Sequence, residues 1–291
     1  MTGRLRLSMI EALDLERTSM EIGAQLARLE LTASDPAALA AFYAKTFGFA
    51  VSQQGDAYVC RAPERELVLR PGDGGQLHLA CFRFSTAAAL LAHREQLRKR
   101  GVALYEQTDT AHTVLDPEGR HIRLEFAPAP SAELAAPDLP AARLQHFAVR
   151  TPDPAALLAF YTEKLGFVLS DRVSDEAGGT TAAFLRTDAE HHAMAIFRAP
   201  LARFDHFSCE AQDWGTLRDW ADHVANAGFP LAWGVGRHGP GNDTFFMLKD
   251  MDGNMAEISA ELEVCQPGRA VGEWPHQPST LNRWGVAIMR S

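Results

Sequence analysis

Three side chains that lie far apart in the chain, His146, His206 and Glu257, have the chemistry of a metal-binding site. Two imidazoles and one carboxylate form the facial triad that holds Fe(II) on one side and leaves its other coordination positions open. A single histidine or glutamate in a strand is more often a hydrogen-bonded or solvated structural residue. The case for a site therefore depends on where the three residues stand in the sequence.

The three residues occupy related places in two copies of one sequence pattern. The stretch LARLELTASDPAALAAFYAKTFGFAVS, residues 26–52, returns as LQHFAVRTPDPAALLAFYTEKLGFVLS, residues 144–170. Two later stretches, HLACF and DPEGRHIRLE, return as HFSCE and DMDGNMAEIS. Alignment of the copies pairs the three candidates with these residues of the first half: Arg28, His78 and Arg123. Because guanidinium groups are cations that cannot act as ligands, the sequence predicts a metal in the second half alone.

Alternation along the predicted strands places each candidate among small or flexible neighbours. On a regular strand, Leu144, His146 and Ala148 share one face, and Gln145 lies on the opposite face with Phe147. The same rule sets the other two candidates beside small or flexible residues of their own strands. Such surroundings suit the floor of a cavity.

Each half begins with a strand that leads into a helix. Asp35 and Asp153 stand at N-cap positions with a proline after each, and the helices end at Gly48 and Gly166. Three short strands follow, marked by β-branched and aromatic residues and by turn glycines, and the pattern then repeats within each half. The sequence thus predicts an α+β fold of four βαβββ modules in two tandem domains.

The predicted domain bounds follow from this repeat. We expect a leader of unknown role at 1–24, an N-terminal domain without metal at 25–128, a linker rich in proline and alanine at 129–141, a catalytic metal-binding domain at 142–265 and a tail at 266–291. The tail carries two tryptophans and further apolar residues, which favours a lid or packing arm.

Composition excludes several classes of protein. Of the 291 residues 46% are hydrophobic and 22% are charged, and the net charge is -9. No stretch approaches the roughly 18 apolar residues of a membrane span, no secretion signal is present, and no basic stripe favours nucleic acid. The four cysteines lack metal-ligand spacing and fit reduced thiols, which predicts a cytoplasmic protein. Exposed sheet edges favour a homo-oligomer.

The βαβββ duplication resembles the vicinal oxygen chelate superfamily over residues 25–262. The resemblance implies a glyoxalase-like fold in which paired modules curl a sheet around a metal site.

The second half resembles one branch of that superfamily more closely, the type I extradiol ring-cleavage dioxygenases of the catechol and homoprotocatechuate 2,3-dioxygenase groups. The motifs that carry this resemblance are HH at 191–192, FDHF at 204–207, GRHG at 236–239, DxDGNxxE at 250–257 and NRWG at 282–285. The resemblance implies that the protein cleaves a catechol-type aromatic diol with O2 at a mononuclear non-heme Fe(II), with Mn(II) as the alternative ion.

The resemblance also implies roles for pocket residues. His192, 14 residues before His206, matches the acid–base histidine of the family. An imidazole suits that role because its pKa lies near the working pH. His191 and His192 would point to opposite faces of a strand, so we expect one of them not to act, and the spacing favours His192. We still expect His191 to lie in the substrate pocket.

His238 and Asn242 follow in the glycine-rich segment of the second half. His238, 19 residues before Glu257, matches a distal histidine that hydrogen-bonds the substrate. The alternatives are that His238 is a surface loop residue and that Asn242 only supports the turn GPGND.

Two pocket positions depart from the family pattern. Met247 stands where the family has a tyrosine, and a thioether has no proton to donate. Trp233 stands where homoprotocatechuate enzymes have an arginine for the carboxylate of the substrate, which favours an uncharged or bulky diol. Arg283 of the tail is the remaining candidate for a cation over the pocket.

Two other classes of function stay open. A related metal-dependent lyase, isomerase or hydrolase would share the triad without needing His192 and His238 beside it. A non-catalytic small-molecule binding protein would have an apolar cleft without metal ligands. The sequence does not identify the diol.

Overall fold

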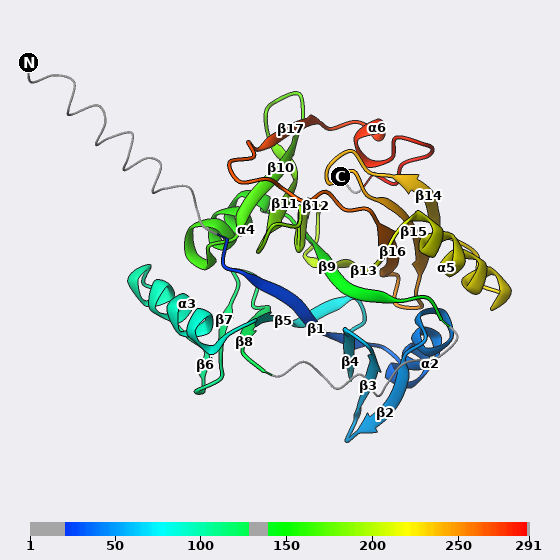
Figure 1. Ribbon diagram of the computed structural model, residues 1–291, viewed down its shortest axis with the longest axis horizontal. Coiled ribbons are helices and arrows are strands. Elements are labelled where there is room, and N and C mark those ends of the chain that lie inside the picture. The colour runs from blue at the N-terminus through cyan, green and yellow to red at the C-terminus, as the bar shows by residue number, and fades with distance from the viewer. Residues whose placement is uncertain (1–20, 128–138, 290–291) are drawn as a thin grey trace, which may run out of the picture.

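The computed structural model describes residues 21–127 and 139–289. Figure 1 shows the first half in blue to cyan and the second half in green to red. The elements of the first half are β1 (Ala24–Ala33), α2 (Pro36–Phe47), β2 (Ala50–Gln54), β3 (Ala57–Ala62), β4 (Arg65–Pro71), β5 (Gln76–Phe84), α3 (Ala87–Lys99), β6 (Glu106–Gln107), β7 (Ala111–Leu115) and β8 (His121–Glu125).

The second half repeats this order and adds a tail. Its elements are β9 (Ala142–Thr151), α4 (Pro154–Ala159) with the π-helical turn η2 (Phe160–Leu165), β10 (Val168–Ser174), β11 (Thr180–Arg186), β12 (Met194–Arg198), β13 (Arg203–Ala211), α5 (Trp214–Asn226), β14 (Trp233–Arg237), β15 (Thr244–Lys249) and β16 (Met255–Ala260), followed by β17 (Gly272–Pro275) and α6 (Pro278–Leu281).

The strands form two sheets, one from each half. Their orders are β2-β3-β4-β1-β5-β8-β7-β6 and β14-β15-β16-β13-β9-β12-β11-β10-β17. In each sheet the first strands of two βαβββ modules pair antiparallel at the centre, β1 with β5 and β9 with β13. The predicted α+β fold of four such modules is confirmed. The domain bounds stay a prediction, and the leader up to residue 20 and most of the linker lie outside the described residues.

The first helix of each half begins and ends where the sequence predicts. The carboxylates of Asp35 and Asp153 each accept a hydrogen bond of 3.0 Å from the backbone N–H three residues on. A proline follows each cap, where the missing N–H has no cost. Gly48 and Gly166 close these helical segments at φ 66° and 87°, a conformation that glycine adopts without strain.

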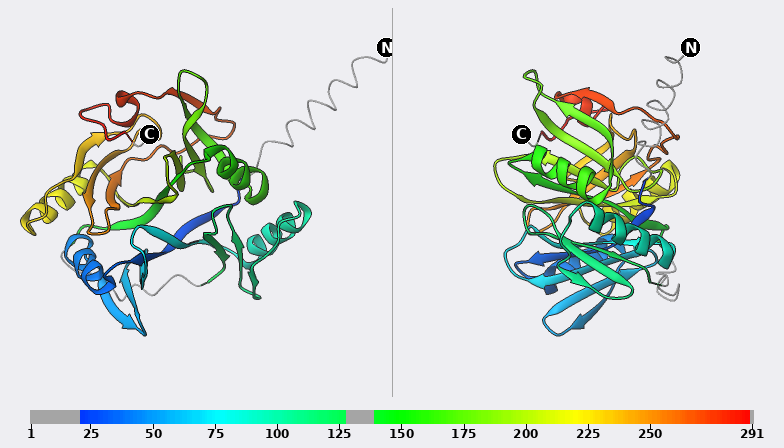
Figure 2. Two further views of the ribbon diagram at one scale, coloured as in Figure 1. Left: turned by 180° about the vertical axis from the view of Figure 1, so that it is seen from behind. Right: turned by 90° about the vertical axis from the view of Figure 1, so that its left-hand side faces the viewer.

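Two buried tyrosines connect the halves through the repeated motifs. Tyr43 of α2 donates a hydrogen bond of 2.7 Å to Asp250, in the turn before β16. Tyr161 of η2 donates one of 3.2 Å to Asp116, in the corresponding turn before β8. Each tyrosine thus reaches across to the aspartate of the other half. Figure 2 shows the two sheets of the molecule from behind and from one side.

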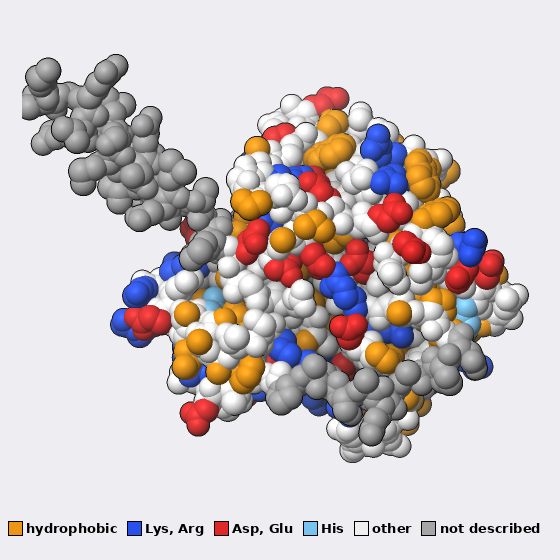
Figure 3. Space-filling view, in the orientation of Figure 1, with side chains coloured by type: hydrophobic (Ala, Val, Ile, Leu, Met, Phe, Trp, Pro, Cys, Tyr) orange, Lys and Arg blue, Asp and Glu red, His pale blue; other side chains and the backbone are white. Residues whose placement is uncertain are grey.

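No helix in the described part of the chain is long and apolar enough to span a bilayer. On the face in Figure 3, acidic and basic side chains are intermixed over both halves.

Replacement of Tyr43 by Phe tests this connection between the halves. The Asp250 carboxylate would lose a buried donor, so we expect the free energy of unfolding to fall by about 1.5–3 kcal/mol. Urea denaturation measures the loss. The control is Tyr105→Phe, since Tyr105 is 56% exposed and its replacement should leave stability unchanged. Equal stability of Tyr43→Phe and the wild type would contradict the assignment.

Candidate metal centre and substrate cavity

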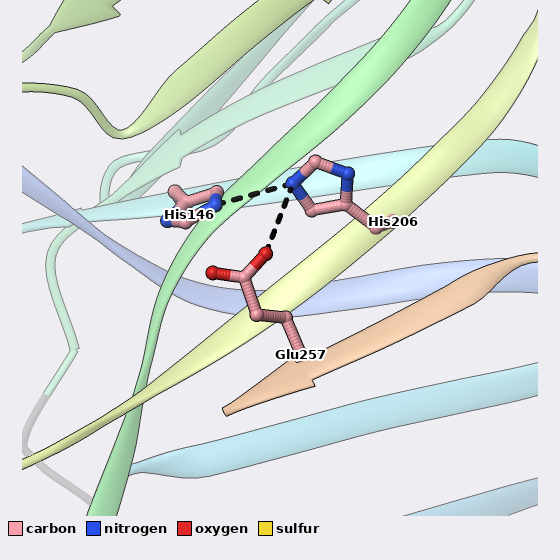
Figure 4. Close-up of side chains that lie close together, drawn as sticks. All are labelled: His146, His206 and Glu257. Carbon is pink, nitrogen blue, oxygen red and sulfur yellow. Dashed lines mark hydrogen bonds and ion pairs between the residues drawn. The ribbon is translucent and has the colours of Figure 1, made fainter. Parts of the chain in front are cut away.

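The fold brings His146, His206 and Glu257 together from three adjacent central strands, β9, β13 and β16 (Figure 4). Nε2 of His146 lies 3.2 Å from Nε2 of His206, and Nε2 of His206 lies 3.8 Å from Oε2 of Glu257. All three side chains are buried, with exposed fractions of 2%, 4% and 0%. The predicted candidates therefore form one cluster whose ligand atoms lie within 4.8 Å of one another.

A β-bulge precedes each of the two histidines. The register between β9 and β13 skips Gln145 on one strand and Asp205 on the other. A bulge adds a residue without a partner, so two consecutive side chains can lie on the same side of the sheet. The expectation that Gln145 faces away from His146 was wrong, because regular alternation does not hold at this point.

The bulged residues orient the two imidazoles. Oε1 of Gln145 lies 2.6 Å from Nδ1 of His146, and Oδ1 of Asp205 lies 2.6 Å from Nδ1 of His206. Both oxygens are acceptors, so each Nδ1 carries the ring proton and each Nε2 presents its lone pair to the centre of the cluster. Arg150 holds the other oxygen of Asp205 with a hydrogen bond of 2.5 Å.

The geometry of these donors fits one divalent ion. Two neutral imidazoles whose Nε2 lone pairs face each other cannot share a hydrogen bond, whereas a cation between them satisfies both. Bonds of about 2.1 Å to one ion at roughly a right angle place two nitrogens ~3 Å apart, close to the observed separation. Burial, followed by the neighbouring imidazoles, holds the pKa of His146 well below its usual value, so the ring is in the neutral form that can act as a ligand. Ser208 donates a hydrogen bond of 3.3 Å to Oε1 of Glu257 and orients the carboxylate.

The first half has none of these ligands at the matching places. Cys81 pairs with both Arg28 and Arg123, just as Ser208 pairs with His146 and Glu257.

Because Cys81 and Ser208 hold equivalent places, counting back along each strand pairs Leu79 with His206. His78 is then the counterpart of Asp205, and both are the bulged residues of their strands. The alignment of His78 with His206 was wrong by one residue, because the sequence does not show where the strand bulges. His78 lies instead against His121, with a ring separation of 4.9 Å.

A narrow apolar cavity lies above the cluster. The residues that line it come from strands on both sides of the triad and from the tail: His146, Phe184, His192, Ala195, Phe197, His206, Trp233, His238, Pro240, Met247 and Leu281. None of these described lining residues is Lys, Arg, Asp or Glu. The interior volume of about 20 Å³ has room for roughly one water molecule.

His192 lies at the cavity and His191 lies behind it. The ring of His192 is 4.3 Å from that of His146, between the centroids, and its exposed fraction is 3%. His191 does not line the cavity. Its Nδ1 lies 3.0 Å from Nδ1 of His192. The expectation of opposite strand faces was wrong, because both residues lie in the connection between β11 and β12, where alternation does not apply.

The other predicted pocket residues divide into two groups. His238, Trp233 and Met247 line the cavity. Nδ1 of His238 donates to the backbone oxygen of Leu281 at 2.6 Å, and Nε1 of Trp233 donates to that of Val286 at 2.7 Å. Both contacts use the backbone of the tail, so the tail packs over the cavity.

Asn242 and Arg283 lie outside the cavity. The side-chain oxygen of Asn242 accepts hydrogen bonds from Arg237 at 3.1 Å and from Arg283 at 3.5 Å. Asn242 has a φ of 54° and so supports the turn, which is the alternative that the sequence left open. The expectations of a pocket role for Asn242 and of a cation over the site from Arg283 are not met.

Several residues at the site were not predicted. Gln145 and Asp205 directly precede the ligand histidines, and this adjacency is a signal once a bulge is known. Phe184 and Phe197, on β11 and β12, form part of the cavity wall. They belong to runs of apolar residues that look like any buried strand, so the sequence carries no signal for them.

Comparison with known proteins identifies the relatives of this chain. Residues 143–258 match the family described as Glyoxalase/Bleomycin resistance protein/Dioxygenase superfamily. Metapyrocatechase 2 from Cupriavidus necator is 26% identical over 86% of this chain and 86% of its own length. A biphenyl-2,3-diol 1,2-dioxygenase from Pseudomonas sp. strain KKS102 is 30% identical over 75% of this chain and 82% of its own length.

Solved structures show the same fold. A Mn(II)-bound glyoxalase from Novosphingobium aromaticivorans superposes with a TM-score of 0.77 at 20% identity, over 93% of each chain. This likeness concerns the fold, whereas the 30% identity to the biphenyl-2,3-diol 1,2-dioxygenase shows that the chain belongs to the extradiol ring-cleaving dioxygenases of the glyoxalase and dioxygenase superfamily.

Replacement of Asp205 by Asn tests how the bulge supports the metal ligand. The variant keeps an acceptor for His206 but removes the negative charge, so we expect metal affinity to fall about 10–100-fold. Anaerobic titration calorimetry with Fe(II) measures it. The control is Asp219→Asn, an exposed aspartate of α5, which should bind the metal as the wild type does. Unchanged affinity in Asp205→Asn would refute the supporting role.

Proposed function

We propose that this protein cleaves a neutral aromatic diol with O2 at a divalent ion, Fe(II) in the first instance, held by His146, His206 and Glu257. The observation that carries the proposal is the convergence of three ligand atoms beside an apolar cavity, which is lined by two of the ligands, His146 and His206, together with His192 and His238. Fe(II) with open positions supplies a place where both diol oxygens and O2 can bind and exchange electron density. Mn(II) is the second candidate, so the choice of ion belongs to the proposal.

His192 is the residue we assign to proton transfer. Burial, followed by the charges of neighbouring imidazoles, holds its pKa well below the usual value, so the ring is neutral before substrate binds. A neutral imidazole takes a proton from a diol hydroxyl and returns it when the ring opens. His238 lines the cavity and donates from Nδ1 to the backbone oxygen of Leu281, and we assign it the role of a hydrogen-bond partner for the diol.

The cavity favours a substrate without charge. Phe184, Phe197, Trp233 and Met247 offer ring faces and a thioether, and no described cation lines the cavity to meet a carboxylate. Burial of an unpaired ionised carboxylate there would cost far more than the roughly 2–7 kcal/mol that burial of an unpaired neutral polar group costs. We therefore assign the site to a neutral diol that carries an apolar group.

The tail is the element that we expect to move when a diol binds. A free volume of about 20 Å³ cannot hold an aromatic ring. Leu281 closes one side of the cavity, and the tail is held over it by the hydrogen bonds from Trp233 and His238. Opening of the tail would leave the central strands, which carry the three ligands, in place.

The alternative is a metal-dependent lyase, isomerase or hydrolase on the same triad. The fold of the Mn(II)-bound glyoxalase is compatible with it. O2 consumption separates the two, because lyases, isomerases and hydrolases consume none.

A cytoplasmic location and a homo-oligomer are also proposals. The four buried cysteines, all free thiols, support the first.

The direct test is anaerobic loading with Fe(II), addition of 2,3-dihydroxybiphenyl, catechol or 3,4-dihydroxyphenylacetate, and admission of air. We expect O2 uptake together with a yellow ring-opened product. His192→Ala should retain the metal but lose about 10²–10⁴-fold in turnover, whereas His146→Ala should lose the metal itself. Absence of O2 uptake with every diol would favour the alternative class.

Replacement of Trp233 tests the substrate preference. Trp233→Arg introduces a cation at the cavity, and we expect the kcat/KM ratio of 3,4-dihydroxyphenylacetate to 2,3-dihydroxybiphenyl to rise at least about tenfold, or ~1.4 kcal/mol. Trp233→Phe is the matched control, since it removes the same N–H donor without adding charge. An equal ratio in the two variants would rule out charge as the basis of selection.

A further inference from the structure

A chain of polar contacts leads from His192 away from the cavity. Nδ1 of His192 lies 3.0 Å from Nδ1 of His191, and Nε2 of His191 lies 3.1 Å from Oδ2 of Asp171 on β10. The three side chains are buried, with exposed fractions of 3%, 0% and 0%. This contact does not have the geometry of a hydrogen bond, so it is one of charge and dipole.

The carboxylate of Asp171 is held by the tail. Its oxygens accept hydrogen bonds from Nε1 of Trp274 at 2.7 Å and from the backbone N–H of Gly272 at 3.2 Å, and the guanidinium of Arg269 lies 2.9 Å away. Burial alone would raise the pKa of Asp171, but these donors and His191 hold it below its usual value. Asp171 is therefore ionised.

The ionised carboxylate determines where the protons of both imidazoles lie. An anion repels a lone pair, so Nε2 of His191 beside Asp171 carries its ring proton. Nδ1 of His191 is then an acceptor, and Nδ1 of His192 must be the donor across the 3.0 Å contact. The nitrogen of His192 that remains is Nε2, with its lone pair available at the cavity.

We propose that Asp171 and His191 are positioning residues that hold His192 in the tautomer with its proton on Nδ1, so that Nε2 acts as the base toward the diol. This inference rests on the role proposed for His192. A proton that passes from a diol hydroxyl to Nε2 makes His192 a cation whose Nδ1–H points along His191 toward the anion of Asp171. The same proton later returns from Nε2 to the product, so none passes along the chain.

Gly272 provides a way to move the carboxylate without removing its charge. A Cβ at this position would lie 2.3 Å from Oδ1 of Asp171, so a side chain there must displace the carboxylate. Gly272 does not have a positive φ, so alanine can adopt its backbone conformation. Gly272→Ala and Asp171→Asn therefore disturb one contact in two different ways.

The first test is the tautomer of His192, read by proton–nitrogen NMR of protein with ¹⁵N-labelled histidine, metal-free and loaded with diamagnetic Zn(II). Signals are assigned from His191→Gln and His192→Gln. We expect the wild type to carry its protons on Nδ1 of His192 and Nε2 of His191. Asp171→Asn and Gly272→Ala should both give His192 a substantial fraction protonated at Nε2, while the surface control Asp219→Asn should match the wild type. A wild-type His192 protonated at Nε2 would overturn the inference, even if no variant folds.

The second test is a double-mutant cycle with the Fe(II)-loaded enzyme. Asp171→Asn should lower kcat about 10–100-fold with little change in KM, and should have no further effect in a His192→Ala background. An equal loss in both backgrounds would mean that Asp171 acts on the structure in general, and the inference fails. Failure of the proposed function has a different signature, because no variant would consume O2 while the tautomer measurement would still give its result.

Discussion

Two imidazole nitrogens that face each other at 3.2 Å, each with a lone pair, are the constraint on which the rest of the second half depends. Neutral imidazoles do not adopt this arrangement without support, since two acceptors repel. Gln145 and Asp205 provide the support because each binds the proton of the ring beside it, and β-bulges allow them to do so from the neighbouring position in the chain. The strands that carry the cluster are central in their sheet, where the backbone is hydrogen-bonded on both sides and cannot readily relax.

The first half shows that this backbone geometry does not require a metal. It has the same antiparallel pair of central strands with bulges at the corresponding places, but Arg28, Leu79 and Arg123 stand where the ligands would be. Glu30 and Glu125 form ion pairs with the two arginines at 3.3 and 3.2 Å. Charge pairs thus occupy the place of an ion. In the described structure each half packs against a turn of the other, the first through Tyr43 on Asp250 and the second through Tyr161 on Asp116.

The wall of the cavity combines strands of the sheet with a segment of the tail. Phe184, Phe197 and Met247 belong to strands of the sheet, whereas Leu281 belongs to the tail, which pairs through β17 with β10 and makes further hydrogen bonds to the rest of the second half. The same tail holds the carboxylate of Asp171 through Trp274. In the proposed function the tail would therefore both cover the diol and contact Asp171, the group that we propose orients His192, so one structural element would serve both roles.

The sequence by itself determined the four modules, the helix caps at Asp35 and Asp153, and the identity of the three candidate ligands. These features follow from local rules, because strand and helix periods, capping residues and repeated motifs are written in consecutive positions. Only the tertiary structure decided where the strands bulge, and with it the neighbours of His146 and the true counterpart of His206. It also placed His191 behind His192 and put Asn242 and Arg283 outside the cavity. A bulge depends on the register with a partner strand more than fifty residues away, and the direction of a loop side chain depends on what packs against it, so neither is encoded in any short stretch of the chain.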